Sequence, residues 1–260
     1  MFMKPRSHRV IHHDAERMGY VDPPLVKAHA VKLKMKLVED WTPLKAILAL
    51  IPWKNGKQGV ISPILHTLCL LQNSLYGTIP NSIGDLSKLT HLDFSHTNLF
   101  GAFPPSIFNL YKLRFFDLTG NQISGRITPE IGQMISLQYL MVSDNLLNGS
   151  LPQEIGALRD LIYLALNRNS LIGPIPASMG SLSNLYFLYL HDNELSGSIP
   201  PEIGKKRNLS GLNLHHNKLS GSVPPEIGKM ANLFYLDLQN NELSGSMCKR
   251  ITAQTNHQLN

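Results

Sequence analysis

The sequence repeats itself every 24 residues, and this period limits what the chain can fold into. The phrase LSGSIPPEIG begins at Leu195, and a near copy, LSGSVPPEIG, begins at Leu219. The same frame runs through eight copies without insertion or deletion. One slot of the frame holds Asn73, Asn121, Asn145, Asn169, Asn193, Asn217 and Asn241, with Thr97 in the second copy. A fixed period of this length is typical of an array of coils in which each unit contacts only its neighbours.

The apolar columns of the repeat predict one short strand in each coil. In YFLYLHDN, Leu188 and Leu190 stand two apart, which places both on one face of a strand. A Leu column lies eight residues before the Asn slot, at Leu65, Leu89, Leu113, Leu137, Leu161, Leu185, Leu209 and Leu233. Stacked strands would form a parallel sheet over a continuous apolar core. The Asn side chains should form a ladder that satisfies buried backbone groups, with a weaker rung at Thr97.

The other half of each coil carries fixed Gly and Pro residues, which predict bends. The Gly four residues after the Asn slot suits a positive φ. Pro lacks an N–H and fixes φ, so it belongs at a turn or a strand edge. We therefore expect LSGSIP to form the strand-free half of the coil, and Ile203 to enter the core from the convex side.

The full unit, L-xx-L-x-L-xx-N-x-L-x-G-x-I-P-xx-I-G-x-L, resembles the plant-type leucine-rich repeat over residues 62–251. The resemblance is to the ectodomain of a plant leucine-rich-repeat receptor-like kinase or receptor-like protein. It implies an α/β-type repeat solenoid, which is a right-handed superhelix of eight 24-residue coils. A parallel sheet would line its concave side, with mostly turns and 3-10 helices on the convex side. The polygalacturonase-inhibitor family shares the same unit.

The ends of the chain depart from the repeat. Residues 1–61 form a basic segment outside the frame, and residues 252–260 form a tail that we expect to be disordered. The net charge of +6 lies within residues 1–60, so the repeats carry no basic stripe for nucleic acid. No signal peptide is readable at the N-terminus, and PLKAILALI is too short to span a membrane. The resemblance implies the cell surface, whereas the chain taken as complete would be cytoplasmic.

Neither catalysis nor a cofactor is predicted. The phrases of a kinase domain are absent, and Asp93, Asp117 and Asp237 read as a polar column of the repeat. The histidines of HRVIHHD lack flanking structure to orient them, so we expect no metal site. Cys69 and Cys248 lie seven coils apart, roughly 34 Å by strand spacing, and cannot form a disulfide.

Three columns on the strands should point away from the core, and they hold our candidate ligand-binding residues. An aromatic run crosses coils three to six with polar side chains beside it, which is typical of an interaction surface. The candidates are Phe115, Asp117, Tyr139, Tyr163, Phe187, Tyr189, His191, Asn213, His215 and Tyr235. We expect the aromatic rings to face solvent, and His191 and His215 to give binding a pH dependence between about pH 5 and 7.

Two functions compete for this surface. The first is recognition of a peptide or protein ligand, and in the resembling receptors this promotes pairing with a co-receptor ectodomain. The alternative is inhibition of a secreted cell-wall hydrolase, for which the family's disulfide cap and signal peptide would be expected. The sequons at Asn148 and Asn208 permit N-glycans but occur at about the frequency expected by chance.

Overall fold

Residues 65–245 are the part of the chain that the computed structural model describes. The basic segment 1–61, the tail 252–260, the HRVIHHD stretch and Cys248 lie outside these residues. The eight predicted strand segments all lie within them.

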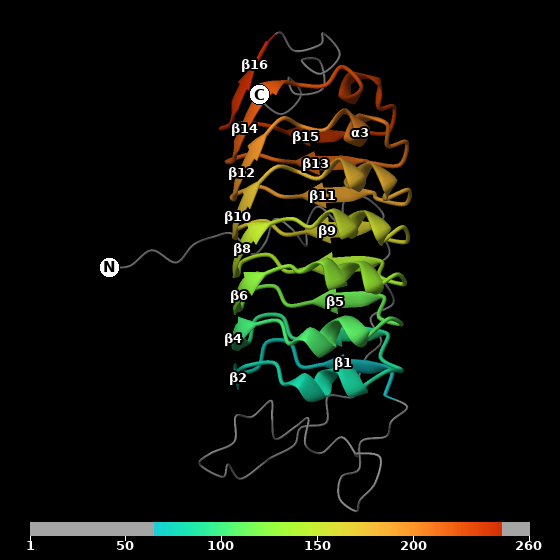
Figure 1. Ribbon diagram of the computed structural model, residues 1–260, viewed down its shortest axis with the longest axis vertical. Coiled ribbons are helices and arrows are strands. Elements are labelled where there is room, and N and C mark those ends of the chain that lie inside the picture. Colours follow the sequence, from blue (N-terminus) through green and yellow to red (C-terminus); the bar gives the residue numbers. More distant parts are fainter. Residues whose placement is uncertain (1–64, 246–260) are drawn as a thin grey trace, which may run out of the picture. The chain divides into compact units, whose positions relative to one another are not determined.

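Eight short strands form a parallel sheet in the order of the coils (Figure 1). They are β1 (Thr67–Cys69), β3 (His91–Asp93), β5 (Phe115–Asp117), β7 (Tyr139–Met141), β9 (Tyr163–Ala165), β11 (Phe187–Tyr189), β13 (Gly211–Asn213) and β15 (Tyr235–Asp237). Paired residues are one repeat apart, as Tyr163 and Phe187 show. The central residues Leu164 and Leu188 are fully buried. The predicted strand, its register and its inward face are therefore confirmed.

A second parallel sheet runs through the LSG segments, which we expected to lack strands. Its strands are β2 (Tyr76–Gly77), β4 (Asn98–Ala102), β6 (Gln122–Arg126), β8 (Leu146–Ser150), β10 (Ser170–Gly173), β12 (Glu194–Gly197), β14 (Lys218–Ser222) and β16 (Glu242–Ser244). Leu195 is buried and Glu194 is exposed, so this segment also alternates. Pairing with neighbouring coils satisfies its backbone groups. The strand-free interpretation was wrong, although Gly197 has the predicted positive φ, 75°.

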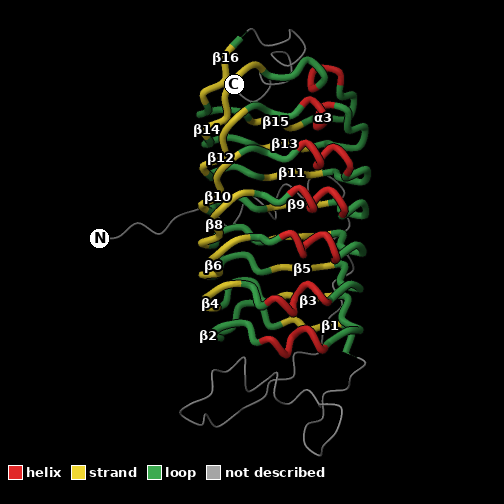
Figure 2. Tube along the Cα trace, in the orientation of Figure 1, coloured by secondary structure: helices red, strands yellow, loops and turns green. Residues whose placement is uncertain are grey.

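Short helices, mostly 3-10, line the side of the coils opposite the first sheet (Figure 2). They are η1 (Asn81–Asp85), η2 (Pro105–Asn109), η3 (Pro129–Gln133), η4 (Gln153–Ala157), η5 (Ala177–Ser181), α3 (Pro201–Gly204) and η6 (Ile227–Lys229). Pro200 stands just before α3 in an extended conformation, with φ −64° and ψ 129°. The chain thus turns into the helix after the Pro. Ile203 is buried, as predicted for the anchor on this side.

One continuous apolar core fills the space between the two sheets and the helices. The predicted Leu column is buried from Leu89 to Leu233, with at most 3% of each residue exposed. Phe94 and Phe116 replace leucines of the neighbouring columns in coils two and three and are fully buried. Because each coil buries its apolar side chains against the coils above and below, no coil has a core of its own.

The Asn ladder joins each coil to the one before it. The side-chain amide of Asn193 donates to the carbonyl oxygen of Leu166 in the preceding coil, at 3.0 Å, and to that of Leu190 in its own coil, at 3.1 Å. Its Oδ1 accepts from the backbone N–H of Leu171, also in the preceding coil, at 3.0 Å. The same pair of backward bonds is made by Asn121, Asn145, Asn169, Asn217 and Asn241.

Thr97 is the weaker rung that the sequence predicts. Its hydroxyl, which has a single proton to donate, lies 2.9 Å from the carbonyl oxygen of Phe94 in its own coil and 2.6 Å from Oδ1 of Asn121 in the next coil. Within the described coils it makes neither of the two bonds to the preceding coil, so the N–H of Leu75 lacks the acceptor that each Asn supplies elsewhere. Coils one and two therefore lack the two ladder hydrogen bonds that join the later coils, and the hydroxyls of Thr90 and Ser106 join them instead through the carbonyl oxygens of His66 and Asn81.

We predict that Leu164→Ala, in the fully buried centre of β9, lowers the free energy of unfolding by about 2–5 kcal/mol. The substitution removes transfer energy and leaves a cavity between coils. The matched control is Leu146→Ala, because that leucine is 56% exposed and its loss should change stability by less than about 0.5 kcal/mol. Denaturant unfolding of both variants measures the difference. Equal effects would show that the core assignment is wrong.

Candidate functional site

The outward side chains of the first sheet form a surface that we call the sheet face. Strand alternation turns the residues on either side of each buried central residue away from the core. The first outward column carries Phe115, Tyr139, Tyr163 and Phe187 on β5, β7, β9 and β11. Each is paired in register with the next, so the four stand in one row across the sheet. The structure therefore brings the predicted aromatic residues together.

The aromatic row is divided into two groups. Phe115 contacts Tyr139, with ring centroids 5.9 Å apart. In the second group, Tyr163 contacts both Phe187 and Tyr189 at 5.6 Å. No ring contact joins Tyr139 to Tyr163 in the described part of the chain, although their strands are paired. The second group is the denser one, because three rings from two strands pack against one another.

Phe187 does not face solvent as predicted, since only 6% of it is exposed. Its neighbour in the next coil is Gly211, which has no side chain that would keep the ring away from the sheet. A Cβ at Gly211 would lie 2.6 Å from Cδ1 of Phe187, so the ring occupies the space that this glycine leaves. Tyr186 also contacts the ring, at 4.9 Å, and Phe234 contacts it at 6.5 Å. Phe187 is therefore a buried support for the tyrosines beside it.

Tyr163 and Tyr189 remain the accessible members of this group, each partly exposed. Burial, followed by the nearby Tyr189 and Asp117, raises the pKa of Tyr163 well above its usual range. Burial likewise raises the pKa of Tyr139. These phenols keep their protons, so they can donate hydrogen bonds to a ligand as well as offer apolar ring surface.

Asn213 is also less exposed than predicted, because 6% of it is accessible. Its side-chain amide donates to the phenol oxygen of Tyr235, at 3.3 Å. Its Oδ1 accepts from the backbone N–H of His215, at 3.2 Å, and lies 2.8 Å from Nδ1 of the same ring. Asn213 therefore positions Tyr235 and His215 and offers little surface to a ligand.

Asp117 lies on the sheet face one coil after Asp93, in register with it. Burial first, and then the charge of Asp93, raises the pKa of Asp117 to about 7. Its Oδ1 accepts from the backbone N–H of Thr119, at 2.8 Å, which opposes the rise. Near neutral pH the protonated form and the ionised form of this carboxyl group are therefore both populated.

Next to Tyr189, on the side of the Asn ladder, lies a group of histidine and aspartate side chains. We call His191, Asp192, His215, His216 and Asp237 the histidine–aspartate cluster. The rings of His191 and His215 stack at 4.6 Å, and Tyr189 contacts His191 at 6.1 Å. Asp192 lies 3.2 Å from Nδ1 of His216 and 3.6 Å from Nε2 of His215. Two predicted histidines are therefore brought together with partners that the sequence analysis did not select.

Two of the missed members, Asp192 and His216, belong to the column just before the Asn slot, and the third, Asp237, lies on β15. Asp192 and His216 have positive φ values, 54° and 47°, which turn their side chains beside the sheet face. Arg168 shares this conformation and lies between two carboxylates, 3.4 Å from Asp144 and 3.5 Å from Asp192. The sequence feature that could have revealed this column is that its position holds a polar residue or Gly in every copy of the repeat. A polar or Gly residue at a fixed turn position indicates left-handed backbone.

The pKa of His191 is lowered to about 4, mainly by burial and then by the neighbouring His215. This imidazole is therefore neutral above about pH 5. The expected change in binding between pH 5 and 7 does not come from His191, because its ring does not titrate in that interval.

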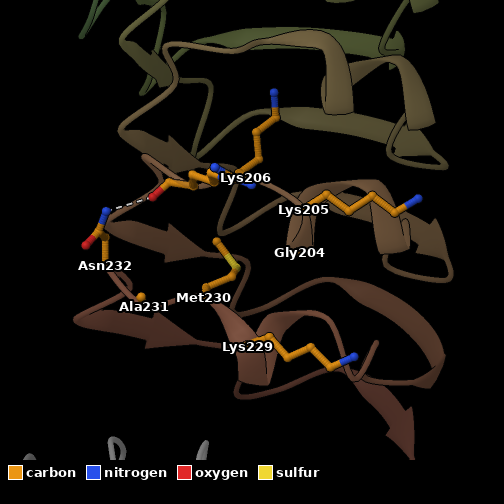
Figure 3. A pocket seen from close by; sticks show the side chains of 8 residues that line it. Gly204, Lys205, Lys206, Lys229, Met230, Ala231 and Asn232 are labelled. Atoms are coloured by element: carbon orange, nitrogen blue, oxygen red, sulfur yellow. Dashed lines mark hydrogen bonds between the residues drawn. The ribbon is translucent and has the colours of Figure 1, made fainter.

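Lys206 is a lysine at a position of the repeat that elsewhere holds a buried apolar residue, and the sequence analysis did not select it. It occupies the column of Leu182 and Met230, one coil to either side, and only 6% of it is exposed. Its Nζ is buried without a hydrogen-bond partner, and burial lowers its pKa to about 8. Figure 3 shows its amino group directed away from Met230. With Lys205, Arg207 and Lys229 it lines a pocket of about 430 Å³ beside α3, away from the sheet face.

The predicted glycosylation sites, Asn148 on β8 and Asn208 after α3, are both exposed. The side-chain amide of Asn208 donates to the carbonyl oxygen of Ser183, at 3.2 Å. Their modification stays a prediction. No helix within residues 65–245 is long and apolar enough to cross a membrane.

Comparison with known families and structures identifies similar proteins. A family described as "Leucine-rich repeat region" matches residues 113–256, and "Leucine Rich Repeat" matches residues 88–110. A comparison with curated protein sequences finds no match. The plant peptide hormone receptor RGFR1 in complex with RGF2 is similar at 42% identity and a TM-score of 0.69, over 70% of this chain and 29% of that one.

Two further solved structures share the fold. The ectodomain of the receptor kinase GASSHO1/SCHENGEN3 from Arabidopsis thaliana, in complex with CASPARIAN STRIP INTEGRITY FACTOR 2, is 39% identical with a TM-score of 0.73, over 74% of this chain and 23% of that one. The Arabidopsis receptor kinase HAESA, in complex with the peptide hormone IDA and the co-receptor SERK1, is 30% identical with a TM-score of 0.65. This match covers 71% of this chain and 35% of that one. The chain thus spans about a quarter to a third of these structures.

We predict that Lys206→Met raises the free energy of unfolding by up to about 3 kcal/mol at pH 7. The folded-state pKa of about 8 lies below the ordinary value of 10.5, so folding opposes the charged form. The unfolded chain therefore binds more protons between about pH 8 and 10.5, and the wild type gains stability relative to the variant as pH rises through this interval. Unfolding of both proteins at pH 7 and 10 measures the gap.

The matched control is Lys205→Met, because that side chain is 67% exposed and forms only a long ion pair with Glu202. Its effect on stability should be small. A Lys206→Met variant no more stable than this control would show that the amino group is solvated.

Proposed function

The chain belongs to the leucine-rich-repeat family, and we propose that its sheet face binds a peptide or an extended segment of a partner protein. The observation that supports this most directly is the packing of Tyr163, Phe187 and Tyr189 into one aromatic group beside the histidine–aspartate cluster. Aromatic side chains held by buried neighbours lose little entropy on binding, and a polar rim gives direction to the contact. The proposed role is recognition rather than catalysis.

The dimensions of the sheet face suit an extended peptide. Strands lie about 4.8 Å apart, so the coils from β5 to β13 span roughly 19 Å. An extended chain advances about 3.3 Å per residue, so about six residues would cross this distance. Such a peptide would contact both aromatic groups and the histidine–aspartate cluster.

The charge of the sheet face favours a peptide that carries a basic residue. Asp93, Asp117 and Asp237 lie on the strands of the sheet face, and Asp144 and Asp192 lie in the column beside it, with Arg168 between them. Asp117 can add to this charge or lose it near neutral pH, because its pKa is about 7. A Lys or Arg side chain beside Asp117 would hold the carboxyl group in its charged form.

The solved structures support the same role for the wider protein. The similar structures are the peptide hormone receptor RGFR1 with RGF2, GASSHO1/SCHENGEN3 with CASPARIAN STRIP INTEGRITY FACTOR 2, and HAESA with the peptide hormone IDA and the co-receptor SERK1. We infer that this chain is a ligand-recognition part of a plant receptor of this kind, placed on the outer side of the plasma membrane, with a co-receptor ectodomain as second partner. Inhibition of a cell-wall hydrolase is not favoured by these likenesses.

We predict that Tyr189→Ala and Tyr139→Ala each weaken peptide binding by more than about 1 kcal/mol, which is about fivefold in Kd. The two substitutions test the two aromatic groups separately. Binding is measured by calorimetry against RGF2, IDA, CASPARIAN STRIP INTEGRITY FACTOR 2 and a library of extended peptides with and without Lys or Arg.

The matched control is Tyr111→Ala, because this tyrosine is 51% exposed and lies outside the strands of the sheet face. Its removal should leave Kd unchanged, and all three variants should melt near the wild type. Equal affinities of the wild type and both sheet-face variants for a bound peptide would place the binding site elsewhere.

A further inference from the structure

The strongest unassigned feature is a set of three side chains in the histidine–aspartate cluster that could together hold a metal ion. His191 and Asp192 follow β11, and His215 follows β13 in the next coil. One ligand atom from each of the three lies within 4.8 Å of those of the other two. The repeat brings them together, since the chain separates Asp192 from His215 by almost one full coil. The short spacings that usually reveal a metal site in a sequence are therefore missing.

The hydrogen bonds of His215 fix which of its nitrogens is available to a metal. Nδ1 lies 2.8 Å from Oδ1 of Asn213 and 3.1 Å from Oδ2 of Asp237. Both of these oxygens accept hydrogen bonds, so the ring proton belongs on Nδ1 and the lone pair on Nε2. A carboxylate that receives the second N–H of an imidazole is the usual support for a metal-bound histidine.

The distance between the free nitrogen and Asp192 fits two ligands of one ion. Nε2 of His215 lies 3.6 Å from Oδ2 of Asp192, which is too far for a hydrogen bond. Two ligands at about 2.0–2.1 Å from a tetrahedral zinc ion lie roughly 3.3–3.4 Å apart. The other oxygen of Asp192, Oδ1, lies 3.2 Å from Nδ1 of His216. The side-chain amide of Asn240 donates to Nε2 of the same ring, at 2.8 Å, so the ring proton belongs on Nδ1 and is donated to Oδ1. Oδ2 is thus the oxygen left for an ion.

His191 supplies a second imidazole that lacks a complete set of partners. Its Nδ1 is buried and has no hydrogen bond, which is costly for a polar atom unless something binds it. One nitrogen of this ring is the ligand atom that lies within 4.8 Å of those of Asp192 and His215.

We propose that His191, Asp192 and His215 bind one Zn²⁺ ion on the sheet face. Two imidazoles and one carboxylate are ligands that zinc prefers, and a fourth position stays open to water or to a side chain of a partner. Asp237 is a positioning residue, because it acts on the ion through His215. The proposed peptide binding does not require a metal, although a bound peptide would contact the same histidine–aspartate cluster.

The guanidinium group of Arg168 competes with the ion for the carboxylate of Asp192. Its Nε lies 3.5 Å from Oδ2 of Asp192, the oxygen assigned to zinc. The same guanidinium reaches Asp144, at 3.4 Å, and its side chain is 41% exposed. Arg168 can therefore pair with Asp144 alone when zinc takes the oxygen, at the cost of one weak ion pair. Its removal should tighten zinc binding.

The test is a zinc titration of the 260-residue chain with His8, His12 and His13 all replaced by Ala, so that the HRVIHHD stretch cannot contribute. Zn²⁺ alone is added to the metal-free protein in competition with a chromophoric chelator. Co²⁺ is added separately, because its visible absorption reports tetrahedral coordination. The parent should bind one zinc ion. His215→Ala and Asp192→Asn should each weaken zinc binding at least tenfold, and Asp237→Asn by about 10–100-fold.

Two further variants keep the test decisive. Arg168→Gln should tighten binding by up to about fivefold, which a merely unfolded protein cannot do. His66→Ala removes an exposed histidine of the first coil and should change nothing. A parent that binds no zinc, or one whose affinity is unchanged in both His215→Ala and Asp192→Asn, would overturn the proposal. Loss of binding in His66→Ala would overturn it equally.

Discussion

The structure depends on the pair of hydrogen bonds that each ladder Asn makes to the coil before it. An array of short coils has no coil that is stable alone, so the contacts between neighbours decide whether the chain folds. The Asn side chain closes the turn after the strand within its own coil, through Leu190 in the case of Asn193. It also satisfies a carbonyl oxygen and an N–H of the preceding coil. A buried turn that left these groups unpaired would lose several kcal/mol per coil.

The same geometry places the side chains of the candidate site. Because each coil advances the chain by one repeat, residues 24 apart in the sequence become neighbours on the sheet face. The left-handed residue before each Asn adds a further column beside them, and this column supplies Asp192 to the histidines of the strands. The aromatic group and the histidine–aspartate cluster are therefore consequences of stacking, and neither exists within a single coil.

The sequence predicted the features that depend on the repeat and missed those that depend on one particular neighbour. The register, the Leu column, the positive φ of Gly197 and the weak rung at Thr97 follow from columns that can be read directly. Phe187 is buried because Gly211 stands beside it in the next coil, and no column pattern expresses that exception. The second sheet was overlooked because its alternation is interrupted by the glycine. The role of the candidate residues in binding stays a prediction.

Backbone hydrogen exchange tests the ladder most directly. The N–H groups that an Asn Oδ1 accepts, such as that of Leu171 facing Asn193, should be strongly protected. The N–H of Leu75, which faces Thr97, should exchange much faster although only 7% of that residue is exposed. Asn193→Ala should raise the exchange rate at Leu171 far more than at Leu219, whose N–H is held by Asn241 instead. Equal protection of Leu75 and Leu171 in the wild type would contradict the account.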